Sequence, residues 1–131
     1  MNLLGVDYGT KNIGLAINNG TEIAFPFRTV KAGENALQEI TDVCDEENID
    51  KIIMGKPTKM NRAEGALAGE IKEFVAKIKE ATGKPVVFED EIFSSAQAGK
   101  MMADYGGKYE KDAIEAAVIL QSHIDRENGS M

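Results

Sequence analysis

The sequence predicts an α/β fold in which helices cover both faces of a mixed five-stranded sheet. Two patterns carry this prediction: short apolar runs separated by tight turns near the N-terminus, and an alternation of helix-like and strand-like segments after residue 31. A chain of 131 residues can bury one hydrophobic core, so we expect a single domain over residues 1–131.

The first 30 residues have the pattern of three antiparallel strands. Residues 3–6 and 13–17 are short apolar runs on either side of a turn. Asn18-Asn19-Gly20 predicts a hairpin turn, because Asn and Gly tolerate the positive φ angles that such a turn requires. The third segment, residues 22–30, contains Pro26, which cannot donate to a strand ladder and therefore indicates an edge strand or a bulge.

The rest of the chain alternates between helices and strands. Apolar residues at helical spacing predict helices near residues 36–44, 67–78 and 98–105 and from residue 112 onward, and apolar runs predict strands at 51–55 and 86–88. The last helix is apolar on nearly every side, so the rest of the protein must cover it. Strands one, four and five are joined through helices and should run parallel with right-handed crossovers. This is the element order of the ribonuclease H-like fold.

Composition limits the kinds of function. The 15 basic and 22 acidic residues give a formal charge of −7 and a pI near 4.8, which argues against a surface that coats phosphate backbones but allows a local basic path. One cysteine, Cys44, and one histidine, His123, exclude a disulfide framework and zinc sites rich in Cys or His. A catalytic metal would therefore rest mainly on carboxylates. Without a membrane-length apolar run or a signal-peptide pattern, we expect a cytoplasmic protein that has no membrane partner.

Acidic residues stand where predicted strands end and where the last helix begins. Asp7 ends a central strand, at the sheet edge where ligands of open α/β sheets bind, although it could simply hydrogen-bond its own turn. Glu89, Asp90 and Glu91 follow another parallel strand, whose alternation places Glu89 and Glu91 on one face and Asp90 on the other. A solvated loop explains this run equally well. Asp112 enters the last helix, where the helix dipole alone favours an acid.

Together, Asp7, one acid of the 89–91 run and Asp112 could hold Mg²⁺ or Mn²⁺, because these hard cations prefer oxygen ligands. Two such ions about 4 Å apart could activate a water and stabilise the leaving oxygen of a phosphodiester. The leading hypothesis is therefore a nuclease with a two-metal site that acts on structured RNA or branched DNA.

Basic residues flank the acids and could together steer a polynucleotide toward them, although any one of them taken singly is more simply explained as an ordinary surface residue. The candidate substrate-binding residues are Gly9, Thr10, Lys11, Lys56, Lys59, Arg62, Lys108 and Lys111. Three of them lie in the segment from residue 55 to residue 65, which we expect to be a loop that clamps the substrate.

Four ordered blocks covering nearly the whole chain resemble the YqgF/RuvX family of bacterial Holliday junction resolvase-like proteins, which are regarded as nucleases that process the 5′ end of pre-16S ribosomal RNA. The blocks are Asp7-Tyr8-Gly9-Thr10-Lys11 with Ile13-Gly14-Leu15-Ala16, Gly55-Lys56-Pro57 with Met60 and Gly65, Asp90-Glu91 before Ser94-Ser95, and Asp112-Ala113 with Ala116-Ala117 and Ile119-Leu120-Gln121. The resemblance implies a ribonuclease H-like fold, a divalent metal and Asp7, Glu91 and Asp112 as catalytic carboxylates and metal ligands, with Asp90 as a further candidate ligand.

The chain departs from the family pattern in ways that favour competing hypotheses. Ile92 and Asn12 stand where the family often has Arg, and Lys56 stands where it commonly has Leu. Losing two arginines removes bidentate phosphate ligands, which predicts weak cleavage or a non-catalytic RNA-binding ribosome maturation factor. Separately, Asp7-x-Gly9-Thr10 before a hairpin also resembles the phosphate-binding turn of the actin, Hsp70 and sugar-kinase superfamily, whose members close two such domains around ATP.

Overall fold

The fold is built on a five-stranded mixed sheet with strand order β3-β2-β1-β4-β5. The computed structural model describes residues 1–56, 62–90 and 95–129. The strands are β1 (Leu3–Asp7), β2 (Asn12–Ile17), β3 (Phe25–Lys31), β4 (Lys51–Lys56) and β5 (Val86–Asp90). β1, β4 and β5 run parallel, whereas β2 is antiparallel to both β1 and β3. The predicted mixed sheet is confirmed.

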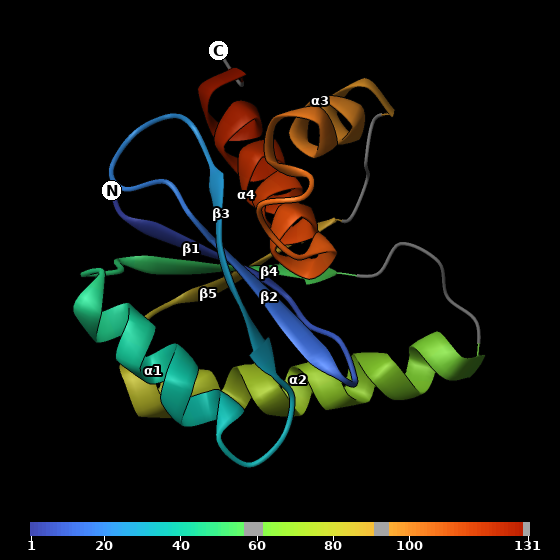
Figure 1. Cartoon of the computed structure of the whole chain (residues 1–131). Helices are drawn as coiled ribbons and strands as arrows, with labels where there is room; N and C mark the ends of the chain where they lie inside the picture. Colours follow the sequence, from blue (N-terminus) through green and yellow to red (C-terminus); the bar gives the residue numbers. More distant parts are fainter. Residues whose placement is uncertain (57–61, 91–94, 130–131) are drawn as a thin grey trace.

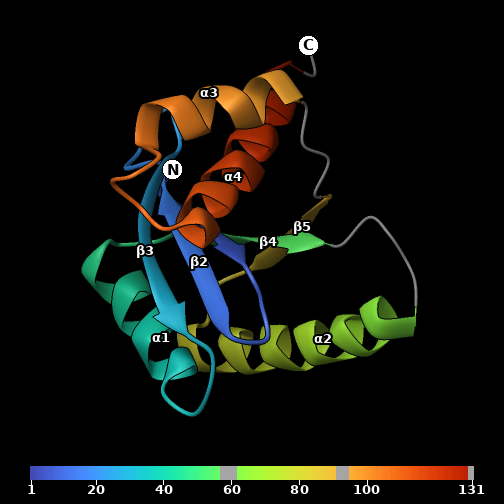
Figure 2. The ribbon, with the colours of Figure 1, turned by 45° about the vertical axis from the view of Figure 1, so that its right-hand side comes forward.

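Two helices cover each face of this sheet. The helices are α1 (Ala36–Glu46), α2 (Arg62–Thr82), α3 (Ser95–Tyr105) and α4 (Lys111–Gly129). α1 and α2 lie on one face, and α4 crosses the other face with α3 packed on top of it (Figure 1). The view in Figure 2 shows the same separation. None of the helices in the described ranges combines the length and hydropathy needed to cross a bilayer.

The α2 boundary corrects one expectation from the sequence. We expected a loop from residue 55 to residue 65, but α2 begins at Arg62 and so takes up the end of that segment. Residues 57–61 lie outside the described residues. The predicted clamp cannot include residues 62–65, since these belong to the helix.

Alternation along the strands builds the two cores. Leu4 and Val6 of β1 join the core that α1 and α2 cover, whereas Leu3 joins the core beneath α4. Ile52 and Ile53 of β4 divide in the same way. This period of two follows from the pleat of a strand, so a sheet buried on both faces carries apolar residues at successive positions.

The predicted turn and edge strand are both present. Asn19 and Gly20 have φ angles of 52° and 78°, and the N–H of Thr21 donates to the carbonyl of Asn18 at 2.9 Å, as a tight turn requires. β3 lies at the edge of the sheet, and its register against β2 shifts at the position where Pro26 pairs with Ala16. The missing N–H of proline explains both features.

α4 lies unusually close to β1 and β2 because glycines stand beneath it. A Cβ atom at Gly5 would lie 2.8 Å from Leu120 Cβ, and one at Gly14 would overlap the carbonyl of Asp112. Ala116 and Ala117 of α4 are completely buried in this contact. Small residues on both partners therefore let the first turns of α4 rest almost directly on the strand backbone.

Candidate metal centre

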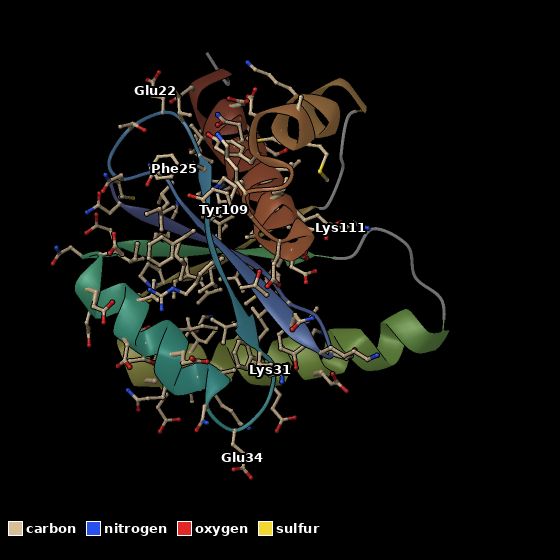
Figure 3. The ribbon with its side chains drawn as sticks, in the orientation of Figure 1. Glu22, Phe25, Lys31, Glu34, Tyr109 and Lys111 are labelled. Atoms are coloured by element: carbon tan, nitrogen blue, oxygen red, sulfur yellow. The ribbon has the colours of Figure 1, made fainter. Side chains whose placement is uncertain are left out.

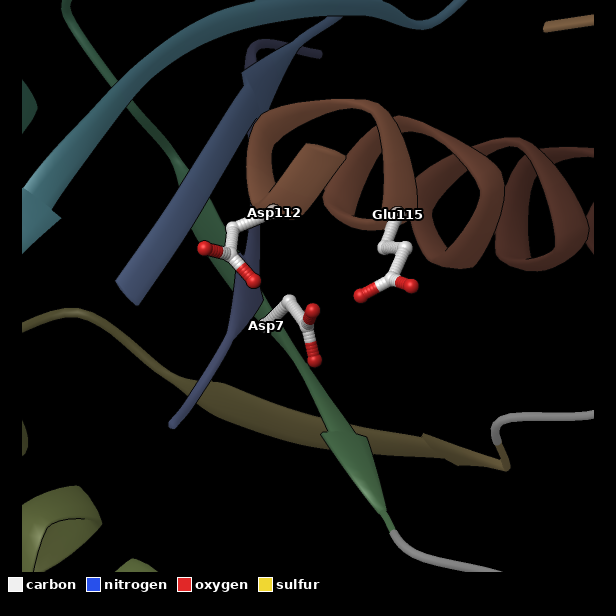
Figure 4. A group of neighbouring side chains, drawn as sticks. All are labelled: Asp7, Asp112 and Glu115. Atoms are coloured by element: carbon white, nitrogen blue, oxygen red, sulfur yellow. The ribbon is translucent and has the colours of Figure 1, made fainter. Parts of the chain in front are cut away.

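Three carboxylates meet at the sheet edge where β1 ends. Asp7 of β1 and Asp112 and Glu115 of α4 each offer an oxygen atom, and these atoms all lie within 4.8 Å of one another (Figure 4). All three residues are half-buried. The group therefore combines close spacing with access from solvent.

The packing of α4 on the strands explains how residues so far apart in sequence meet. Asp7 is the last residue of β1, and its partner across the antiparallel pair is Gly14 of β2. The backbone of Asp112 rests on Gly14, because glycine leaves no Cβ in the way. Asp112 is thus placed beside Asp7 by backbone contact. Glu115 follows three residues later on the same side of the helix, as helical spacing requires.

The electrostatics of the group favour a cation. Three carboxylates this close repel one another unless they share a positive partner. The N-terminus of α4 supplies part of this compensation through its backbone dipole. Lys111 Nζ lies 3.8 Å from Glu115 Oε1, but its side chain is 76% exposed, and such i,i+4 pairs contribute only about 0.3–0.5 kcal/mol. Lys111 therefore does not prevent Glu115 from binding a metal ion.

The donor set fits Mg²⁺ or Mn²⁺. All three donors are carboxylate oxygens, which hard divalent cations prefer over nitrogen or sulfur. Octahedral Mg²⁺ at about 2.1 Å from its ligands places ligand oxygens about 3 to 4 Å apart, so oxygens within 4.8 Å need only small side-chain rotations to reach it. Within the described ranges, this is the one group of three potential metal ligands drawn from His, Cys, Asp and Glu.

The structure therefore brings together two of the predicted acids and adds a third that the sequence reading missed. Glu115 was missed because the last helix was read as an apolar element. A signal was available, since Glu115 is the one acid within the buried run from Ala113 to Leu120 and stands one turn after Asp112. Glu91 lies outside the described residues, as does the side chain of Asp90, the final residue of β5.

Glu89, the first acid of the 89–91 run, does not belong to this group. Its side chain is 9% exposed and accepts a 2.7 Å hydrogen bond from Arg126 Nη2 of α4. His123 Nδ1 lies 3.1 Å from the same Glu89 oxygen. Glu89 thus ties β5 to the C-terminal half of α4. His123, the one histidine of the chain, is a buried packing residue bound to this carboxylate.

The basic candidates are distributed around the same end of the molecule. Lys11 is exposed in the turn that follows Asp7, and Lys108 and Lys111 are exposed where the chain enters α4. Gly9 and Thr10 lie in the Lys11 turn, and a Cβ atom at Gly9 would press against the carbonyl of Asn12. Lys59 lies outside the described residues, and so do the side chains of Lys56 and Arg62.

Two other features lie away from the acids. A cavity of about 350 Å³ is lined by residues at the starts of β1 and β4, among them Leu3 and Lys51, and so opens at the opposite end of the strands from Asp7. Cys44 is buried in the core under α1, and this burial raises the pKa of its thiol to about 11. A thiol held in its protonated form is a core group rather than a nucleophile.

Comparison with known proteins gives extended matches in sequence. A family model described as "RuvX: Holliday junction resolvase" matches residues 1–126. A protein of Endomicrobium trichonymphae is 35% identical over an alignment of 133 positions that covers 94% of each chain. A protein of Geobacillus kaustophilus (strain HTA426) is 35% identical over an alignment of 135 positions that covers 95% of this chain and 98% of the relative. Both relatives bear the name "Putative pre-16S rRNA nuclease".

Comparison of structures gives resolvases with the same fold. RuvC of T. thermophilus, solved in complex with a Holliday junction substrate, superposes with a TM-score of 0.66 at 14% identity, covering 99% of this chain and 97% of that one. The Fowlpox virus resolvase, solved with Holliday junction DNA, gives a TM-score of 0.57 at 16% identity, covering 97% of this chain and 99% of that one. At such low identity, these likenesses establish the fold.

Proposed function

The chain belongs to the RuvX family of Holliday junction resolvase-like proteins, and from this premise we propose that it is a nuclease that hydrolyses phosphodiester bonds with the help of a divalent cation. One observation carries the proposal. Three carboxylates from β1 and α4 lie within 4.8 Å of one another at the carboxyl edge of the sheet. The ATP-binding alternative is not favoured, because the family match extends over residues 1–126.

For the substrate, we favour the precursor of 16S rRNA, cleaved near its 5′ end. Relatives at 35% identity over nearly the whole chain carry a name that specifies pre-16S rRNA. The resolvases solved with branched DNA share only 14–16% identity with this chain, so their substrates are a weaker guide. A four-way DNA junction remains the comparison substrate in the experiment below.

The chain's own residues supply the binding and positioning parts of the mechanism. Asp7, Asp112 and Glu115 would hold the cation, and Glu91, which follows β5 in sequence, is the proposed fourth carboxylate. A bound Mg²⁺ or Mn²⁺ supplies Lewis-acid stabilisation of charge on the phosphoryl oxygens and lowers the pKa of water. Strand β1 fixes Asp7, and the contact of α4 with Gly14 fixes Asp112, so neither ligand depends on a loop for its position.

We also propose that the full set of acids holds two ions. Four carboxylates offer enough oxygen ligands for two cations that keep part of their water, as Mg²⁺ does in phosphoryl-transfer sites. Calorimetric titration with Mn²⁺ should then give a stoichiometry near two per chain, and Glu91→Gln should reduce it to near one. A stoichiometry of one in the unaltered chain would contradict the two-ion site while leaving the nuclease proposal intact.

Cleavage by isosteric variants tests the proposed activity. Asp7→Asn and Glu115→Gln remove one charge each from the group, and we expect at least a roughly hundredfold loss of Mn²⁺-dependent cleavage of a pre-16S rRNA 5′ fragment. Asp104→Asn is the matched control, since Asp104 is an exposed acid on α3 and should leave the rate unchanged.

Three outcomes would overturn or redirect this proposal. Full activity of folded Asp7→Asn would refute the assignment of the site. Tight RNA binding by the unaltered chain without any metal-dependent product would instead support a non-catalytic maturation factor. Faster cleavage of a four-way DNA junction than of the RNA fragment would replace the substrate and keep the chemistry.

A further inference from the structure

An exposed aromatic ring stands close in sequence to the candidate metal centre and belongs to neither hydrophobic core. Tyr109 is 41% exposed and stands three residues before Asp112, in the connection from α3 to α4. Figure 3 shows Tyr109 and Lys111 where the chain enters α4. Three residues span at most about 11 Å of extended chain, so the ring lies within reach of a strand whose phosphate sits at the acids.

The backbone holds this ring in place. The N–H groups of Lys108 and Tyr109 both donate to the carbonyl of Tyr105, at 3.0 Å and 3.2 Å. The ring of Tyr105 supports the ring of Tyr109 edge-on, with centroids 6.0 Å apart and an angle of 75° between planes. Tyr109 is therefore attached to the last turn of α3, and ordering it on binding costs little entropy.

The surroundings of Tyr109 favour an anionic ligand that has an aromatic face. Lys108 and Lys111 are exposed on either side of it in sequence, with one exposed acid, Glu110, between them, whereas the protein as a whole carries a charge of −7. Lysines that contact the backbone together with an aromatic ring that stacks on a base are the usual elements of single-strand recognition.

We infer that Tyr109 stacks on an unpaired nucleobase of the substrate strand, next to the phosphate that a cation held by Asp7, Asp112 and Glu115 would bind. This inference rests on the proposed nuclease function and specifies its substrate further. A base inside a duplex does not present its face, so the strand must be single-stranded or opened at this position. Tyr109 is thus a substrate-binding residue that selects unpaired nucleotides beside the cleavage point.

A binding cycle that combines protein variants with RNA lacking single bases tests this inference. The probe is a single-stranded RNA of roughly 12 nucleotides, a length that such sites cover. Its bases are removed one position at a time. Binding is measured in Ca²⁺, which carboxylates also hold, and the RNA is checked afterwards for cleavage. Tyr109→Leu removes the ring, and Tyr109→Phe keeps it. Phe88→Leu is the matched control, because Phe88 is 40% exposed and lies on the face of the sheet opposite to α4. Its register partner on β4 is Met54, which packs under α1 and α2.

We expect Tyr109→Leu to weaken binding by about 5-fold to 150-fold, the range for one stacked base, and Tyr109→Phe and Phe88→Leu to bind like the unaltered protein. Removing one particular base should weaken binding to the unaltered protein by a similar factor and should have no further effect on Tyr109→Leu. Equal binding by Tyr109→Leu, or the same base-removal profile for both proteins, would overturn the inference. Mn²⁺-dependent cleavage, measured separately, reports on the proposed function, so the two ideas can fail independently.

Discussion

Replacing Gly14 by Ala should damage the candidate metal centre without touching any of its proposed ligands. The new Cβ would overlap the Asp112 carbonyl and lie 2.8 Å from Ala113 N, and both of these groups belong to the helix backbone, which cannot rotate away. Real Cβ atoms essentially never come closer than 3.0 Å, so the first turn of α4 must retreat, by about 1 Å or more. This moves Asp112 away from Asp7.

The magnitude has two parts. Overpacking of this kind costs about 1–3 kcal/mol of the free energy of unfolding. A displacement of about 1 Å at a catalytic group costs roughly a hundredfold in rate. We therefore expect weaker Mn²⁺ binding by calorimetry and roughly hundredfold slower cleavage. Both are measured under conditions in which a urea titration shows the variant to be fully folded.

Gly5→Ala is the control for this prediction. Its Cβ would lie 2.8 Å from Leu120 Cβ and 2.9 Å from the Ala116 carbonyl, so it presses on the same helix at a point beyond both acids. It should cost similar stability but less Mn²⁺ affinity and less rate. Folded Gly14→Ala with the Mn²⁺ affinity and the rate of the unaltered protein would refute the account of how the acids are brought together.

Two further predictions concern buried groups outside the candidate metal centre. Arg126→Met should lower the free energy of unfolding in urea by about 1.5–3 kcal/mol, because it removes a charged hydrogen bond from the buried Glu89 carboxylate. The side chain of Arg126 is 60% exposed, which favours the lower end of this range. Arg126→Lys should recover part of the loss, and an unchanged urea midpoint for Arg126→Met would contradict the prediction. For Cys44, burial raises the thiol pKa from 9.0 to about 11, so the unfolded chain loses this proton first and the free energy of unfolding should fall as pH rises from about 9 to about 11. Cys44→Ala should show a smaller fall over this interval, and identical pH curves would exclude the thiol as the cause.

Most of the fold could be predicted from the sequence because hydrophobic period and turn residues report local structure directly. Asn19-Gly20 and Pro26 each produced the feature expected of them, a tight turn and an irregular edge strand. The start of α2 could not be predicted, since Gly65 suggested a loop where the structure has a helix beginning at Arg62. A glycine only lowers helix propensity by about 1 kcal/mol, and the rest of a 21-residue helix outweighs that cost.

The candidate site was harder to predict because it depends on a contact between distant segments. Sequence position suggested that Asp7, an acid at a strand end, and Asp112, an acid at a helix start, belong to one metal site. It could not show that Gly14 lets the Asp112 backbone rest beside Asp7, because that contact depends on how closely the helix approaches the sheet. Nor could strand alternation alone separate Glu89 from a metal ligand, since its partners Arg126 and His123 come from the far end of another element.

These contacts give α4 two connections to the sheet, one at each end. Its first turn rests on Gly14 and carries Asp112 and Glu115, whereas its last turns hold Glu89 of β5 through His123 and Arg126. β5 ends one residue after Glu89, directly before the predicted ligand Glu91. The strands that end in acids are therefore connected to one buried helix, and the spacing of the acids follows from how that helix packs on the sheet. Ligands positioned by regular elements keep their geometry better than ligands carried on loops, which is the condition that catalysis by a bound cation imposes.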